Sequence, residues 1–210
     1  MVAENRITET MPGPRRIFLA GIACVGKTAI GNELATLLGC RFYDLDTEVE
    51  AFYGTSIERL QKQHRFMDDF RKAAAKVLGH ILLDPESHHC VVALPPRGLM
   101  GPYWSVVRKS QATIVVIRDE PENILNRIIF FDIDSRPVTR LLSQDERRLY
   151  LREIKEDITY FNRSYKKATM SVDISGLNIE ASAQRIQNEL DAPATDGHTV
   201  SRSAAAGPAW

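Results

Sequence analysis

Short apolar segments alternate with longer amphipathic segments along most of the chain. The apolar segments have the length of buried strands and cover residues 16–20, 41–44, 90–94, 112–117 and 171–174. Apolar residues recur at helical spacing over residues 27–38, 46–53, 56–83 (with a break near His64), 121–128, 144–167 and 179–190. Continuous apolar strands that alternate with helices are typical of a parallel sheet covered on both faces. We therefore predict a three-layer α/β/α fold with a five-stranded parallel sheet.

Two of the predicted helices carry signals for where they begin or end. Gly39 follows the first helix and predicts its C-terminal end, because glycine readily adopts the left-handed conformation found there. Asp119 precedes Pro121, and we interpret Asp119 as the N-cap of the helix that starts at this proline.

The two ends of the chain lack the apolar pattern of the middle. Residues 1–14 are polar, and we expect them to form a flexible segment. Residues 191–210 are small and polar, which predicts a disordered tail. The segment between them, residues 15–190, has a length that suits one folded domain.

Composition narrows the class of protein. Lys plus Arg and Asp plus Glu both count 27, so the formal net charge is zero, which argues against a nucleic-acid-binding protein. No apolar run reaches the roughly 18 residues of a membrane span, and the start of the chain does not resemble a signal peptide. Three cysteines without metal-ligand spacing fit reduced thiols. We expect a cytoplasmic monomer that acts on a small molecule, with no nucleic acid and no membrane as partner.

Residues 21–28, GIACVGKT, fit the phosphate-loop pattern G-x-x-x-x-G-K-[ST] between a predicted strand and a predicted helix. Such a loop points backbone N–H groups at phosphate oxygens, and the following helix adds its positive N-terminal end. We predict that Lys27 reaches the β- and γ-phosphates and that the Thr28 hydroxyl binds Mg²⁺. The cofactors are therefore ATP and Mg²⁺. The residues expected at the nucleotide are Gly21, Cys24, Val25, Gly26, Lys27, Thr28 and Ala29.

With this loop in place, the chain resembles shikimate kinase, a small P-loop kinase, from about residue 17 to residue 190. The first matching block is IFLAGIACVGKTAIGNELATLLGCRFYDLDTEVE, which carries the loop and then Asp-x-Asp after a strand. Shorter blocks follow: Phe70-Arg71 in a helix, Ser135-Arg136-Pro137, and ATMSVD over residues 168–173. The resemblance implies a P-loop kinase fold with a lid segment, and we expect residues 131–142 to be mobile without ligand.

The resemblance also implies roles for five further residues. Asp44 would hold Mg²⁺ through water, and Asp46 would bind the accepting hydroxyl and could take its proton. Arg71 would pair with the carboxylate of the substrate, and Arg136 would move in with the lid to neutralise the transferred phosphoryl group. Arg127 stands where the family often has a basic residue near the adenine.

Each of these residues has a simpler interpretation. Asp44 and Asp46 could cap the following helix, because aspartate is a favoured cap residue. Arg71 could be a solvated helix residue, and Arg136 could be an ordinary loop cation. Cys24 could respond to oxidation at a helix N-terminus, but we interpret it as a small residue that fits the loop.

The part of the family pattern that binds the acceptor is altered in three places. The glycine triplet after the third strand is replaced by Pro95-Pro96-Arg97, which removes two backbone donors and adds a cation. The second carboxylate-binding arginine of the family is replaced by Tyr160 or Phe161, and Arg163 could substitute for it. In addition, Ala74 stands where the family has an acidic residue that orients Arg71.

These observations predict an ATP-dependent kinase for a hydroxyl of a small anionic polyol, with shikimate and its 3-phosphate as first choice. The role would then be in aromatic amino acid biosynthesis. We expect the catalytic residues to be Lys27, Asp46 and Arg136. The residues expected to bind the acceptor are Asp46, Arg71, Pro96, Arg97 and Arg163. Two alternatives stay open: a kinase for another hydroxy acid, such as a sugar acid, or a nucleotide-binding regulatory module without catalysis.

Overall fold

The computed structural model describes residues 15–192, and its centre is a five-stranded sheet in the order β2-β3-β1-β4-β7. Every neighbouring pair of strands is parallel. The strands are β1 (Arg16–Ala20), β2 (Arg41–Asp44), β3 (Cys90–Ala93), β4 (Thr113–Arg118) and β7 (Met170–Asp173). All five predicted strands are confirmed, with bounds that differ by at most one residue.

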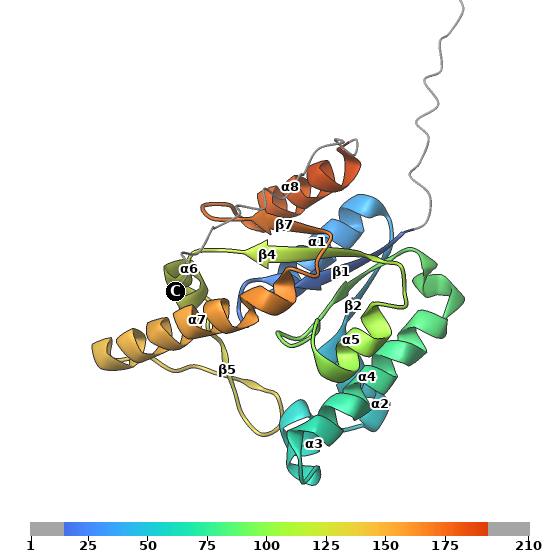
Figure 1. Ribbon diagram of the computed structural model, residues 1–210. Helices are drawn as coiled ribbons and strands as arrows, with labels where there is room; N and C mark the ends of the chain where they lie inside the picture. The colour runs from blue at the N-terminus through green and yellow to red at the C-terminus, as the bar shows by residue number, and fades with distance from the viewer. Residues whose placement is uncertain (1–14, 193–210) are drawn as a thin grey trace, which may run out of the picture.

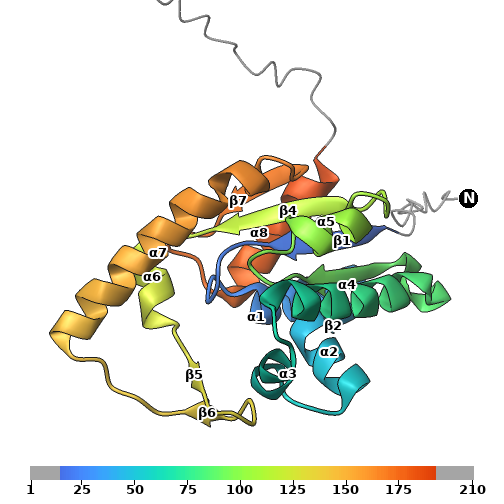
Figure 2. The same ribbon diagram turned by 60° about the horizontal axis from the view of Figure 1, so that its bottom comes forward.

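Helices cover both faces of the sheet, so the predicted three-layer architecture is confirmed (Figure 1). On one face α1 packs against α8, and on the other α4 packs against α2 and α5, with α7 beside them (Figure 2). The helices are α1 (Lys27–Leu38), α2 (Leu45–Tyr53), α3 (Ile57–Gln63), α4 (Met67–Leu83), α5 (Gly101–Val107), α6 (Pro121–Asn126), α7 (Gln144–Tyr165) and α8 (Ile179–Asp191), with a short 3₁₀ helix η1 (Pro85–His88). Among the helices of residues 15–192, none has the length and apolar character needed to cross a bilayer.

The ends of several helices follow from their local sequence. Gly39 adopts a φ of 61° and its N–H bonds back to the carbonyls of Ala35 and Thr36, which confirms the predicted end of α1. The break near His64 is also confirmed, because α3 ends there and α4 starts three residues later. Helix α8 ends one residue beyond the predicted domain limit. The predicted flexible segment 1–14 and nearly all of the predicted tail lie outside the described residues.

A β-hairpin was not predicted from the sequence. Strands β5 (Phe130–Phe131) and β6 (Pro137–Val138) pair antiparallel and form a second, two-stranded sheet. The hairpin lies on the connection from α6 to α7 and reaches the end of α3, as both ribbon views show. It therefore bridges two helices that are far apart in the sequence, and it occupies the segment in which the lid was expected.

The core is built around the central strands of the sheet. Ile17, Phe18, Val91 and Val115 are fully buried, as expected of strands covered on both faces. In open parallel sheets, ligands bind at the carboxyl ends of the strands. The loops after β1, β2 and β3 meet at this edge, and they carry most of the residues described next.

Candidate active site

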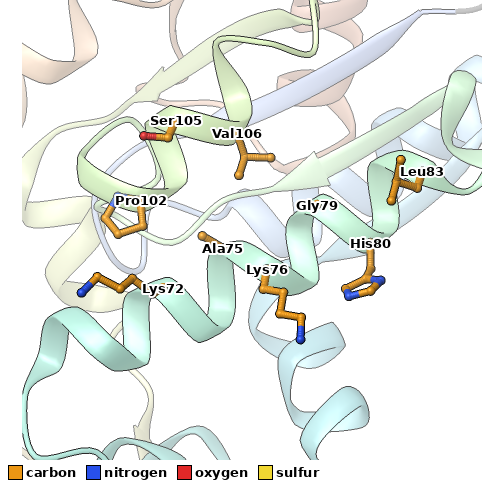
Figure 3. A pocket seen from close by; sticks show the side chains of 9 residues that line it. All are labelled: Lys72, Ala75, Lys76, Gly79, His80, Leu83, Pro102, Ser105 and Val106. Carbon is orange, nitrogen blue, oxygen red and sulfur yellow. The ribbon is translucent and has the colours of Figure 1, made fainter.

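A cavity of about 850 Å³ lies at the carboxyl edge of the sheet. Its walls come from the phosphate loop, the start of α2, the loop after β3 and the connection after α6. A second hollow, of about 550 Å³, lies away from this edge between α4 and α5 (Figure 3), and its lining is Lys72, Ala75, Lys76, Gly79, His80, Leu83, Pro102, Ser105 and Val106. Most of the predicted site residues line the first cavity, and none lines the second.

The phosphate loop has a backbone that two glycines make possible. Gly21 has a φ of 151°, and a Cβ at this position would lie 2.8 Å from the carbonyl oxygen of Ile117. Gly26 has a φ of 103° and forms the N-cap of α1, where a side chain would be strained. Cys24 adopts a φ of 58° and lines the cavity. The N-terminal end of α1 therefore opens directly onto the cavity, as a phosphate site requires.

Lys27 folds back onto this loop. Its Nζ donates hydrogen bonds to the carbonyl oxygens of Gly21, at 3.0 Å, and Ile22, at 2.8 Å. Burial lowers the pKa of the ammonium group to about 8, and the negative charge of Asp46 partly opposes this shift. An anion in the loop would compensate for the lost hydration of the ammonium group, so Lys27 is suited to a phosphate partner.

Thr28 and Asp44 both line the cavity and are joined by a hydrogen bond. The Thr28 hydroxyl donates a 2.6 Å hydrogen bond to Oδ2 of Asp44, and Oδ1 of Asp44 accepts from the backbone N–H groups of Asp46 and Thr47. Asp44 thus does cap α2, as the simpler interpretation held, but with one oxygen only. Its other oxygen and the Thr28 hydroxyl face the cavity, where a hydroxyl and a carboxylate suit Mg²⁺ with water and phosphate oxygens as further ligands.

Asp46 lies in the first turn of α2 and does not cap the helix. Asp46 is exposed and lines the cavity, but the protein atoms around its carboxyl group reduce the hydration of that group. This desolvation and the negative charge of Asp44 raise the pKa of Asp46 to about 6, while Lys27 acts in the opposite direction. A carboxylate with a raised pKa next to a phosphate site can accept a proton near neutral pH.

Arg127 lies at the opposite wall of the cavity, just after α6. One guanidinium nitrogen donates to the carbonyl oxygen of Val25 in the phosphate loop, at 3.4 Å, and another lies 2.6 Å from a carboxylate oxygen of Asp119. The prediction that Asp119 caps α6 is wrong, because Glu120 occupies the N-cap position without a side-chain cap. Helix α6 starts at Pro121, as predicted, so the residue before it, Glu120, is the N-cap, and Asp119 pairs with Arg127 instead.

The acceptor side of the cavity differs from the predicted set. Arg71 is half-buried on α4 and lies outside the residues that line the cavity. Its positive charge and the negative charge of Asp46 both act on the hydroxyl of Tyr103, whose pKa is raised mainly by burial. Tyr103 is buried on α5 and was not among the predicted site residues.

The loop after β3 is fastened to α7. Arg97 donates a 2.9 Å hydrogen bond to the Tyr160 hydroxyl, and its guanidinium lies 5.4 Å from the centre of the Tyr160 ring and 6.0 Å from that of Phe161. The Tyr165 hydroxyl donates to the Pro96 carbonyl oxygen at 3.1 Å. Pro96 lines the cavity and Arg97 lies just outside it.

Two further predicted arginines lie at the surface. Arg163 is exposed on α7, almost one turn after Tyr160. Arg136 is exposed on the hairpin, where only its backbone is fixed, through hydrogen bonds with Asp132. Neither belongs to the residues that line the cavity.

The tip of the hairpin contacts the acceptor side of the site. The Ser135 hydroxyl lies 2.5 Å from a carboxylate oxygen of Glu50 and 2.6 Å from one of Glu58, and Arg59 pairs with Asp134 at 2.6 Å. Ser135 itself has a φ of 57°. Sequence reasoning missed the two glutamates, because nothing in the local pattern links residues so far apart. The mobility of residues 131–142 stays a prediction, and these contacts are what an opening hairpin would break.

Comparison with known proteins identifies the family and agrees with the fold. The family model for shikimate kinase matches residues 23–191. A shikimate kinase from Chlorobaculum tepidum is 30% identical over 183 residues, which cover 83% of this chain and 90% of that protein. A shikimate kinase from Caldanaerobacter subterraneus is 27% identical over 174 residues, with 82% and 94% covered. The crystal structure of a shikimate kinase from Bacteroides thetaiotaomicron has the same fold, with a TM-score of 0.68, 20% identity, and 84% and 98% covered.

The family match includes the loop residues from position 23 on, and it extends through both aspartates and Arg127 to the last helix. The chain therefore belongs to the shikimate kinase family and is an ATP-dependent small-molecule kinase.

Proposed function

We propose that the chain transfers the γ-phosphoryl group of ATP to a hydroxyl of shikimate and produces shikimate 3-phosphate. The observation that carries this proposal is the joint placement of Lys27, the Thr28–Asp44 pair and Asp46 around one cavity. The relatives named shikimate kinase, which match nearly their whole length, support the choice of acceptor. The same proposal places the chain in aromatic amino acid biosynthesis, as a monomer in the cytoplasm.

The phosphate loop would bind the triphosphate through its backbone N–H groups and the positive end of α1. Lys27 would exchange its two carbonyl partners for phosphate oxygens, which keeps its ammonium group charged at neutral pH. Because phosphoryl transfer depends mainly on positioning and charge neutralisation, this ammonium group is the main contribution of the loop to the reaction.

Thr28 and Asp44 are the residues that would hold Mg²⁺. When bound, the ion neutralises phosphate charge and fixes the orientation of the triphosphate. The hydrogen bond between the two residues keeps a hydroxyl and a carboxylate oxygen together at the cavity wall. Asp44 is also held by the backbone of α2, so its orientation does not depend on a ligand.

Asp46 would orient the accepting hydroxyl and take its proton. The pKa of its carboxyl group is raised to about 6, so the group is largely ionised at neutral pH but is more basic than an ordinary aspartate. Asp46 also lies close enough to Lys27 for each charge to shift the pKa of the other. A hydroxyl held by Asp46 would therefore lie near the end of the triphosphate.

The acid group of the acceptor would be bound by arginines from three elements. Arg71 on α4 is the first of these, because its charge and that of Asp46 both act on the hydroxyl of Tyr103. Arg97 would supply a second cation from the loop after β3, beside Pro96, and Arg163 a third from α7. Arg136 would approach the transferred phosphoryl group when the hairpin closes further, and Arg127 would contact the adenine end of ATP.

The loop of Pro95 and Pro96 favours a second candidate, a hydroxy acid other than shikimate. Both prolines line the cavity and neither can donate a backbone hydrogen bond. An acceptor here would receive hydrogen bonds from side chains instead of from the loop backbone. A sugar acid, with hydroxyl groups at several angles, is the alternative that this loop suits.

A coupled assay for ADP release tests both candidates. Shikimate, ATP and Mg²⁺ should give turnover well above the rate without acceptor, and Lys27→Met should abolish the difference. A panel of hydroxy acids under the same conditions separates the candidates. Turnover with a sugar acid but not with shikimate would reject shikimate as acceptor, and activity with shikimate alone would reject the second candidate.

A further inference from the structure

Asp119 is a buried carboxylate that the proposed reaction does not use. Its side chain is 0% exposed, at the point where β4 ends. Oδ1 accepts two hydrogen bonds of 2.7 Å, from the backbone N–H of Glu120 and from the side-chain amide of Asn123. Oδ2 is buried and accepts no hydrogen bond, but it lies 2.6 Å from the guanidinium of Arg127, so this ion pair is the contact that offsets its burial.

An unpaired buried carboxylate is costly, so the pair with Arg127 is a strong constraint on both partners. Asp119 is held by hydrogen bonds from the backbone after β4 and from Asn123 on α6. Arg127, by contrast, follows α6 directly and would otherwise have the rotamer freedom of a long side chain. The constraint therefore acts in one direction, from the rigid aspartate to the arginine.

A second nitrogen of the Arg127 guanidinium reaches the phosphate loop. Its Nη1 lies 3.4 Å from the carbonyl oxygen of Val25, a residue whose side chain is fully buried beneath the loop. The guanidinium thus spans from the end of β4 to the loop, while 37% of its side chain stays exposed and lines the cavity. Because two of its nitrogens are held, the planar guanidinium presents one face to a ligand in the cavity.

The segment around Arg127 is also held from the side of α7. Asn126, the last residue of α6, accepts a 2.8 Å hydrogen bond from the side chain of Arg147. The hairpin that follows is attached to α3 instead, through Arg59 and Ser56. Arg127 therefore belongs to the rigid base of the hairpin and not to its tip, so it can keep its position when the tip moves.

We propose that Asp119 is a positioning residue for nucleotide binding: it holds Arg127 against the phosphate loop so that the guanidinium forms a preformed wall of the nucleotide site. This inference rests on the proposal that the cavity binds ATP. Because Arg127 would be ordered before the nucleotide arrives, binding would not require further loss of rotamer freedom there. The contribution of Asp119 would be equal for ATP and ADP and would leave the transfer step unchanged.

The test is the affinity for ADP, measured by calorimetry on the full chain. Asp119→Asn keeps an oxygen for the two hydrogen bonds of Oδ1 but removes the charge that holds Arg127. We expect ADP to bind about tenfold more weakly, as for the loss of one partly exposed charge pair. In steady-state kinetics the KM for ATP should rise by a similar factor, while kcat stays within about twofold of the wild type.

A double-mutant cycle separates positioning from a general structural effect. Arg127→Met should weaken ADP binding as much as Asp119→Asn does, and the two changes together should weaken it no further. Asp191→Asn is the matched control, because it removes the Arg15–Asp191 ion pair at the far end of the sheet. This control should bind ADP like the wild type.

The proposal is overturned if Asp119→Asn binds ADP normally, or if it weakens binding equally in the presence and absence of the Arg127 side chain. Normal ADP binding by Arg127→Met would overturn it as well, even if Asp119→Asn does not fold. Failure of the wild type to bind ADP would have a different meaning, because it would reject the proposed function together with this inference.

Discussion

The two halves of the cavity are built in different ways. In the phosphate half, the hydrogen bonds of Lys27 span six residues or fewer, and Thr28 reaches Asp44 only 16 residues later. In the acceptor half, Arg97 meets Tyr160 across 63 residues of sequence, and Ser135 meets Glu50 across 85. Apart from Arg127, which reaches the carbonyl of Val25 across 102 residues, the first half is a local motif, and the second is assembled by the tertiary fold.

This difference has a physical consequence for how each half can vary. A loop whose shape depends on two glycines and a helix end tolerates few substitutions, because a Cβ at Gly21 would collide with the carbonyl of Ile117. The acceptor half depends on side-chain contacts between a loop, two helices and a hairpin. Such contacts can be exchanged one at a time while the fold persists, so the acceptor can differ where the nucleotide does not.

The largest effect is expected from Lys27→Met. The change keeps the volume of the side chain but removes the ammonium group at the phosphates. We expect kcat/KM to fall by about 1,000-fold, the upper range for loss of one charged group that stabilises a transition state. A coupled ADP-release assay measures this, with Lys76→Met on the exposed face of α4 as the matched control. A Lys27→Met enzyme with the activity of the control would contradict the role of the whole phosphate half.

The same division between local and tertiary features separates the elements that could be predicted from the sequence from those that could not. All five strands, α1 and the break near His64 were predicted, because apolar period and glycine ends are local signals. Helix α5 was missed because its start, Gly101-Pro102, has the composition of a turn. The hairpin was missed because its strands are two residues long, too short for a pattern.

The candidate site shows the same limit. The residues of the phosphate loop were found from their spacing alone. The pairing of Asp119 with Arg127, and that of Ser135 with Glu50 and Glu58, could not be found this way, because each depends on which loops the sheet order brings together. Without that order, Asp119 before a proline had only the local interpretation of a helix cap.

The next largest effect is expected at the border between the halves, from Asp46→Asn. Loss of the proton acceptor should lower kcat by about 100-fold. In the wild type, turnover should decline as the pH falls through about 6, because the raised pKa of Asp46 means that its carboxylate becomes protonated there. The pH profile of kcat/KM measures this, and the residual activity of Asp46→Asn should lack that acid limb. If Asp46→Asn keeps the same acid limb in its pH profile, the limb arises from another group.

Within the acceptor half, Arg71→Met should raise the KM for the acceptor by about 30-fold, the value of one charged hydrogen bond to a carboxylate. The KM for ATP should stay the same, since Arg71 is on α4 and is not one of the residues that we propose to bind the nucleotide. Arg163→Met is the matched comparison, from an exposed position on α7. A larger effect at Arg163 than at Arg71 would mean that the acceptor binds against α7 and not against α4.

The smallest effect, and the sharpest test of the acceptor half, is expected from Tyr160→Phe. The change removes the hydroxyl that holds Arg97 but keeps the aromatic ring beneath the guanidinium. We expect the KM for the acceptor to rise about threefold, as for one hydrogen bond, with the KM for ATP unchanged. Initial rates at varied acceptor concentration measure it.

Tyr53→Phe is the control for this change, because it removes a tyrosine hydroxyl that donates a long hydrogen bond to the carbonyl of Ala73. If Tyr160→Phe behaves like Tyr53→Phe, Arg97 does not bind the acceptor through the position that Tyr160 gives it. Binding of the acid group of the acceptor would then depend on Arg71 and Arg163. The contacts between α7 and the loop after β3 would serve only to hold Pro96 in the cavity wall. If the threefold effect appears and is lost when Arg97 is replaced by Met, the cation that binds the acceptor is carried by the loop after β3 and oriented from α7.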